Sequence, residues 1–170
     1  LLSIKNSKLF LKTQELSNNK FSEEILNRFK KFNVNTGRVV LEGKSKTREE
    51  VLKTYRHIDI SLDPFPFQGN TSTCESVWMG VPVLTLKGDR YISHFGESIN
   101  SNLNMKDWIA DSKDDYLKKA IHFSSDIDRL EKIRITLRKS ASLSAVFDSD
   151  RFSKHFAVIL WDMWKNFKKK

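Results

Sequence analysis

Short runs of apolar and β-branched residues alternate with longer amphipathic segments along the first two thirds of the chain. Five runs are short enough to be buried strands and lie at residues 7–13, 38–43, 58–62, 82–86 and 107–110. Four segments between them have helical spacing and lie at residues 21–33, 46–57, 71–79 and 94–103. Strands that alternate with helices are typical of parallel sheets built from crossover units. The pattern predicts an α/β fold with a Rossmann-like parallel sheet and flanking helices.

Local signals refine these predicted elements. Ser22 precedes Glu24 and is predicted to cap the first helix, and Gly37 is predicted to close that unit. The rest of the chain has only helical periodicity, which predicts an all-helical carboxyl-terminal end with helices at 113–125, 126–140 and 148–167. The last of these has an apolar stripe, for which packing in the core is the default expectation. Its members include Phe156, Ile159, Trp161 and Trp164.

The length of 170 residues fits one domain or one half of a two-lobed enzyme, so residues 1–170 are treated as one domain with one core. The chain does not begin with Met, and we expect Leu1 to start a fragment of something longer. It contains no apolar run of about 20 residues, so no membrane partner is predicted. Cys74 is the only cysteine, which excludes an intrachain disulfide and fits a reducing, cytoplasmic setting.

The formal net charge is +9, which would suit an anionic partner. Most lysines and arginines are interspersed with acidic residues, as on solvated helix faces, and only the terminal KNFKKK is a dense cluster. No basic motif with interleaved aromatic residues accompanies the charge. A role in binding nucleic acid is therefore not predicted.

The loop between the third predicted strand and the next helix carries the candidate chemistry, in PFPFQGNTSTCESVWM. In open parallel sheets ligands bind beyond the carboxyl ends of strands, where helices begin with free N–H groups. Gly69 permits close approach of the backbone, Thr71 and Ser72 add hydroxyls, and Glu75 adds a carboxylate. This set suits a diphosphate and the hydroxyls of a ribose. A plain capping box of Ser72 with Glu75 explains the same residues, and the loop is neither a dinucleotide fingerprint nor a P-loop.

Other reactive side chains are given structural roles. The four histidines have no spacing typical of metal ligands, so no metal site is predicted. Cys74 lies in a predicted helix without a nearby histidine and is interpreted as an inert, small apolar residue. Asp59 and Asp63 would lie roughly 13 Å apart along an extended strand, too far for paired acid and base chemistry. They are predicted to cap turns and strand ends.

Residues 58–86, IDISLDPFPFQGNTSTCESVWMGVPVLTL, resemble the carboxyl-terminal catalytic lobe of the O-GlcNAc transferase and SPINDLY-type family. Those proteins are GT-B glycosyltransferases with tetratricopeptide repeats in front of the catalytic lobes. The resemblance continues through GDRYISHFGESI and SAVFDSDRFSKHFAVILWDMW, so it covers the chain from Ser7 to about Trp164. It implies a nucleotide-sugar-binding lobe of an inverting enzyme that transfers a sugar to a protein Ser or Thr hydroxyl. It also implies that the last helix crosses back to the other lobe, which would leave part of its apolar stripe exposed in this chain.

The resemblance also implies roles for particular residues. UDP-GlcNAc and GDP-fucose are the donors in the two branches of the family, and the transfer needs no metal. Glu75 would accept hydrogen bonds from the ribose, and Arg48 would lie beside the nucleoside. The residues that would hold the diphosphate are Gly69, Asn70, Thr71 and Ser72. The candidate catalytic base and most acceptor contacts belong to the preceding lobe and the repeats, so no catalytic residue is assigned and the isolated chain is expected to be inactive.

The sequence departs from the family pattern at three positions. Val51 stands where the family usually has His, His94 where it has a basic residue, and Asn70 where Thr or His is more typical. These departures leave the identity of the donor open. They also keep a second interpretation open, in which the chain is a non-catalytic or degenerate module that binds a nucleotide or another anion.

Overall fold

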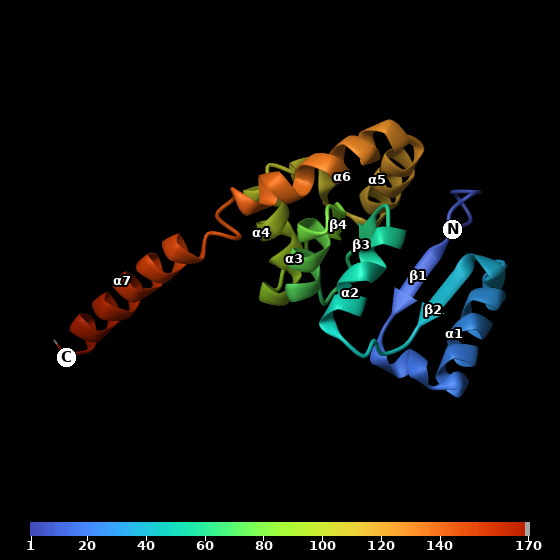
Figure 1. Ribbon diagram of the computed structural model, residues 1–170, viewed down its shortest axis with the longest axis horizontal. Coiled ribbons are helices and arrows are strands. Elements are labelled where there is room, and N and C mark those ends of the chain that lie inside the picture. The colour runs from blue at the N-terminus through green and yellow to red at the C-terminus, as the bar shows by residue number, and fades with distance from the viewer. Residues whose placement is uncertain (169–170) are drawn as a thin grey trace.

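Figure 1 shows the computed structural model, which describes residues 1–168 of the chain. The predicted basic cluster KNFKKK extends into residues 169–170, which lie outside the described part. Every strand in the described part runs parallel to its hydrogen-bonded neighbour. The α/β class with parallel strands and flanking helices is therefore confirmed. The strands are β1 (Leu9–Lys12), β2 (Val39–Glu42), β3 (Ser61–Leu62), β4 (Val83–Leu86) and β5 (Ile109–Ala110).

The strands form two sheets, whereas the alternating pattern predicts one. One sheet has the order β1-β2 and the other has the order β3-β4-β5, with β4 in the middle. Strands of one sheet lie about 4.8 Å apart, and a sequence pattern that identifies strands does not tell which strands approach so closely. Parallel strands are usually covered on both faces. Here every residue of β1 is only half-buried, and Val40 and Leu62 remain 39% and 47% exposed.

The β1-β2 unit contains helix α1 (Asn19–Lys31) between its strands, and its ends differ from the prediction. Asn18 caps the helix, because its side chain accepts hydrogen bonds from two backbone N–H groups of the first turn. Ser22 lies inside the helix, where its hydroxyl donates to the carbonyl of Leu16 at 3.0 Å. At the other end Asn33, with φ of 58°, takes the left-handed conformation predicted for glycine. Gly37 lies beyond it in a short 3-10 turn.

The main core surrounds β4, because successive residues of a strand face opposite sides. Val83 packs with Val77, Ile99 and Leu137 from helices on one side of the sheet. Leu84 faces the other side, where Trp108 stacks on Phe123 with ring centroids 4.0 Å apart. The helices that supply these side chains are α3 (Thr71–Trp78), α4 (Phe95–Asn102), α5 (Lys113–Ser125) and α6 (Ile127–Ser142). Val83, Leu84 and Thr85 of β4 are buried, which gives the following loops a rigid base.

The last helix, α7 (Ser149–Lys168), extends away from the rest of the chain (Figure 1). The default expectation that its apolar stripe packs in the core is wrong, since Trp161 and Trp164 are 60% and 49% exposed, whereas the exposure expected for a last helix that crosses to another lobe is observed. The helix has no buried residue. Among the described residues, no helix has the length and apolar character needed to cross a membrane. The exposed residues that share one face of α7 are Phe152, Phe156, Ile159, Leu160, Met163, Trp164 and Phe167.

Candidate functional site

Asp63 directly follows β3 and holds the start of the candidate loop. Its side chain is buried, with the residue only 3% exposed, and its two oxygens have different partners. Oδ1 accepts a hydrogen bond from the N–H of Gly69 at 2.8 Å, and Oδ2 accepts one from the hydroxyl of Thr85 at 2.8 Å. Burial raises the pKa of the Asp63 carboxyl, and the two hydrogen bonds oppose that rise. The predicted strand-end role of Asp63 is confirmed, and the carboxylate also connects the loop to β4.

Gln68 provides a second connection that the sequence analysis did not identify. It is 1% exposed, and its Nε2 donates to the carbonyl of Leu86 at 2.6 Å. Its Oε1 accepts from the N–H of Gly96 at 2.7 Å, at the start of α4. The loop between β3 and α3 is thereby tied to the carboxyl end of β4 and to a neighbouring helix. The residues that follow it are held in place before any ligand binds.

Helix α3 begins at the end of this loop with its first turn open to solvent. Asn70 is the N-cap, and its side chain accepts no capping hydrogen bond. Within the described residues, no protein acceptor pairs with the backbone N–H groups of Thr71, Ser72 and Thr73. Asn70, Thr71 and Ser72 are exposed, and Gly69 is half-buried. Unpaired N–H groups and the positive end of the helix dipole favour an anion at this position.

The capping-box explanation of Ser72 and Glu75 is wrong. Ser72 is the second residue of α3 and Glu75 is the fifth, so neither occupies the position that a capping box requires. The hydroxyl of Thr73 instead donates to the carbonyl of Gly69 at 2.9 Å. The carboxylate of Glu75 therefore does not cap α3.

Arg48, the first residue of α2 (Arg48–Thr54), lies against Glu75 although the two are far apart in sequence. Its Nη1 forms an ion pair with Oε1 of Glu75. The side chain of Arg48 is 62% exposed, whereas that of Glu75 is 11% exposed. A third residue, Tyr55, places its hydroxyl 3.4 Å from the other oxygen of Glu75. The structure thus joins the amino-terminal ends of α2 and α3 into one site.

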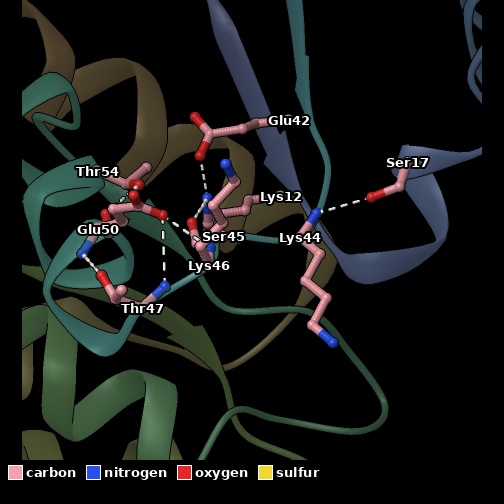
Figure 2. Close-up of polar contacts among 9 residues, drawn as sticks. All are labelled: Lys12, Ser17, Glu42, Lys44, Ser45, Lys46, Thr47, Glu50 and Thr54. Atoms are coloured by element: carbon pink, nitrogen blue, oxygen red, sulfur yellow. Dashed lines mark hydrogen bonds and ion pairs between the residues drawn. The ribbon is translucent and has the colours of Figure 1, made fainter.

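Figure 2 shows how the start of α2 is held. The hydroxyl of Thr47 accepts from the N–H of Glu50 at 3.2 Å, and the Glu50 carboxylate turns back toward the N–H groups of Lys46 and Thr47. This is a capping box, and it fixes where the helix begins. Arg48 follows directly, so the capping box fixes its backbone at the start of α2.

The loop before α2 is also bound to the first sheet (Figure 2). Lys12 of β1 donates from Nζ to the hydroxyl of Ser45 at 2.7 Å, and it pairs with Glu42 at the end of β2. The N–H of Lys44 donates to the hydroxyl of Ser17 at 2.9 Å. These contacts connect the β1-β2 unit to the helix that carries Arg48.

The residues that depart from the family pattern have ordinary local surroundings. Val51 is half-buried on α2. His94 precedes α4, and its Nδ1 lies 2.6 Å from Oε2 of Glu97 in the first turn of that helix. The imidazole that replaces the family's basic residue is therefore engaged by a carboxylate of the same helix.

Cys74 has the properties of a packing residue. Burial raises the pKa of its thiol, and the charge of Glu75 raises it further, so the thiol stays protonated at neutral pH. Its partly buried side chain packs against the core cluster, as the sequence interpretation expected. No group of three or more His, Cys, Asp or Glu side chains within residues 1–168 is arranged to hold a metal ion.

A separate hollow of about 640 Å³ lies beside β5 and contains none of the candidate residues. Two of the cations that line it face carboxylates. Lys87 lies 2.5 Å from Asp111, and Arg129 lies 3.3 Å from Asp107. Because these two cations are already paired, they attract an anion less than unpaired cations would.

Comparison with known proteins gives matches over nearly the whole chain. A family model described as Glycosyl transferase family 41 matches residues 4–156. A protein of Eustoma exaltatum subsp. russellianum, named probable UDP-N-acetylglucosamine--peptide N-acetylglucosaminyltransferase SPINDLY, is 30% identical over 167 residues, which are 98% of this chain and 18% of that protein. A mutant of Thermobaculum terrenum O-GlcNAc transferase superposes with a TM-score of 0.84 and 27% identity, covering 98% of this chain and 31% of that one. The chain thus spans about a fifth of the length of the curated relatives it matches.

Proposed function

We propose that this chain, which belongs to glycosyl transferase family 41, is the donor-binding lobe of an enzyme that transfers a sugar from a nucleotide-sugar to a protein. Membership of the family confirms the resemblance that residues 58–86 indicated. The identity of the donor, inversion at the anomeric carbon and the Ser or Thr acceptor hydroxyl are parts of this proposal. So does the activity of the complete protein, since this chain covers only 31% of the matched transferase.

The observation that carries the proposal is the open first turn of α3, with the ion pair of Arg48 and Glu75 beside it. Three unpaired N–H groups and two exposed hydroxyls suit the oxygens of a diphosphate. The carboxylate of Glu75 lies one turn further along the helix, where it suits the hydroxyls of a ribose. Arg48 lies on the outer side of Glu75, where a nucleoside would extend toward solvent.

In the proposed reaction, the acceptor oxygen bonds to the anomeric carbon while the bond from that carbon to the diphosphate breaks. The nucleoside diphosphate leaves with the bonding electrons, and the hydroxyl proton passes to a base that this lobe does not supply. The N–H groups and hydroxyls of Thr71 and Ser72 stabilise the charge that grows on the leaving diphosphate. Removing one such preorganised donor typically costs about 3 kcal/mol of transition-state stabilisation.

The apolar face of α7 supports the proposed partnership with a second catalytic lobe. Seven large apolar side chains on one face are exposed in this chain, from Phe152 to Phe167. An exposed apolar surface of this length is typical of an interface rather than of a solvated helix. Because the chain is 31% of the solved transferase it matches, the rest of such a protein could provide the surface that covers this face.

A titration of the chain with UDP and GDP in the absence of Mg²⁺ tests the proposal. Backbone amides of Gly69 to Thr73 should shift in a heteronuclear NMR spectrum, with smaller changes elsewhere. Sodium sulfate is the matched control for a plain anion. If sulfate produces the same shifts at every position and the same affinity, the site is a general anion site and the proposed nucleotide specificity is wrong.

A second candidate function, a non-catalytic nucleotide- or anion-binding module, is favoured by His94. Its imidazole is paired with Glu97 rather than free to meet a phosphate. The two functions differ in a transfer assay with a chain extended upstream through a second lobe. Binding without transfer by that longer chain would support the module.

A further inference from the structure

Tyr55 links the two helix ends of the candidate site. It begins the short 3-10 helix η3 (Tyr55–His57) that follows α2. Its hydroxyl lies 3.2 Å from the carbonyl oxygen of Ser72 and 3.4 Å from Oε2 of Glu75, so it can donate to either acceptor. Burial raises the pKa of the phenol, and the neighbouring Glu75 raises it further. The hydroxyl therefore keeps its proton and acts as a hydrogen-bond donor at neutral pH.

Glu75 is held through both of its carboxylate oxygens. Oε1 is paired with Arg48 and Oε2 faces Tyr55. Each carboxylate oxygen has a second lone pair, so both can still accept a hydrogen bond from a ligand. A glutamate side chain has several rotatable bonds, and two contacts on opposite oxygens restrict them before the ligand arrives.

The two contacts differ in rigidity. The backbone of Tyr55 is anchored by Arg134 of α6, whose Nη2 donates to the carbonyls of Tyr55 at 3.0 Å and of Ile58 at 2.9 Å. Arg48, in contrast, reaches Glu75 with a side chain that is 62% exposed. The Tyr55 hydroxyl is therefore the more rigidly placed contact of Glu75, and the Arg48 guanidinium is the contact that can adjust.

We infer that Tyr55 is a positioning residue that holds the Glu75 carboxylate in the orientation that accepts the ribose hydroxyls. The inference rests on the proposed nucleotide site. It assigns to Tyr55 the selectivity for a nucleoside diphosphate over a bare diphosphate. Phosphate binding itself depends on the first turn of α3 and does not need the phenol.

The test compares the affinities for UDP and for inorganic pyrophosphate in the wild-type chain and in Tyr55→Phe, measured by calorimetry. The substitution removes only the hydroxyl. The lost hydrogen bond is to a charged carboxylate, which corresponds to an affinity change of about tenfold or more, and we expect UDP to lose about tenfold while pyrophosphate stays within about twofold. Tyr116→Phe is the matched control, because that half-buried phenol also donates to a backbone carbonyl, of Asp63 at 3.2 Å, but lies away from Glu75. Its ratio of the two affinities should equal the wild-type ratio.

A double-mutant cycle with Glu75→Gln separates a positioning role from a structural one. If Tyr55 acts through the carboxylate, Tyr55→Phe should not change the affinity ratio further in the Glu75→Gln background. A fully additive effect, or equal losses for UDP and pyrophosphate, would overturn the inference. Selectivity for UDP that survives Tyr55→Phe would also overturn it and leave the proposed function intact. A wild-type chain that binds UDP no better than pyrophosphate would overturn both.

Discussion

Asp63 offers a sharp test of how the candidate loop is held in place. Replacing it with alanine leaves the N–H of Gly69 and the hydroxyl of Thr85 without their acceptor, in a position where Asp63 is 3% exposed. Each buried group left unpaired costs about 1–3 kcal/mol, so Asp63→Ala should lower the free energy of unfolding by about 2–6 kcal/mol. Asp63→Asn has the same shape and can both accept from the N–H and donate to the hydroxyl. It should cost less than about 1 kcal/mol.

The same residue gives a pH dependence with a defined sign. The pKa of Asp63 is raised above 3.8 in the folded chain, so the folded form binds the proton more tightly than the unfolded form. This contribution to stability is present below the unfolded pKa and is lost as the pH rises through the folded pKa. The side chain of Asp63→Asn cannot titrate. As the pH rises from 3.8, the wild type should therefore lose unfolding free energy relative to Asp63→Asn.

Urea unfolding followed by tryptophan fluorescence measures both effects, with Asp59→Ala as the control on the same strand segment. Asp59 is exposed, and its replacement should change the free energy of unfolding by no more than about 0.5 kcal/mol. Equal stability of Asp63→Ala and Asp63→Asn would refute the claim that the hydrogen bonds of Asp63 to Gly69 and Thr85 stabilise the fold. A wild-type pH profile that Asp63→Asn reproduces unchanged would refute the assignment of the raised pKa.

Two further predictions concern the backbone and the reaction. Gly80 has φ of +80°, and a Cβ there would lie 2.6 Å from the carbonyl oxygen of Arg134, so Gly80→Ala should cost at least about 2 kcal/mol of unfolding free energy. Gly37→Ala, whose Cβ would lie 3.2 Å from the flexible Asn35 side chain, should cost under about 1 kcal/mol in the same assay. The isolated chain should transfer no sugar to a Ser/Thr peptide, and a chain extended through a second lobe should do so. In that longer chain, joint replacement of Thr71 and Ser72 by leucine should lower the rate about a hundredfold, or ~2.7 kcal/mol. Transfer by the isolated chain, or full activity after the double replacement, would contradict the proposed role of the lobe.

The position of the candidate loop, directly before a helix amino terminus, could be predicted from local sequence. Gly69, Asn70, Thr71 and Ser72 follow a strand and precede a helix, and in an open parallel sheet that order alone places a helix amino terminus at the carboxyl edge. The periodic runs likewise predicted the strands and helices, because the faces of a helix and a strand differ in period. The difference between the predicted and the observed cap of α1 also has a local cause. Asn18 and Ser22 have similar capping ability, and the path of the chain leaving β1 decides between them.

The rest of the site depended on contacts between distant segments. Tyr55 has its partners 17 and 20 residues further along the chain, so no local pattern could assign its hydroxyl to Glu75. The sequence was also compatible with a capping-box interpretation of Glu75, and the observed start of α3 at Thr71 excludes it.

What the sequence by itself determined is the set of elements, because hydrogen bonding within a helix and the alternation of a strand depend on neighbouring residues. Only the tertiary structure decided how those elements meet. The strands separate into β1-β2 and β3-β4-β5, and the apolar face of α7 is exposed. An apolar stripe indicates that a helix face should be covered, but it does not identify the covering surface. That surface depends on which segments approach one another in space, and the free energy of burying apolar area is the same for any partner that fits.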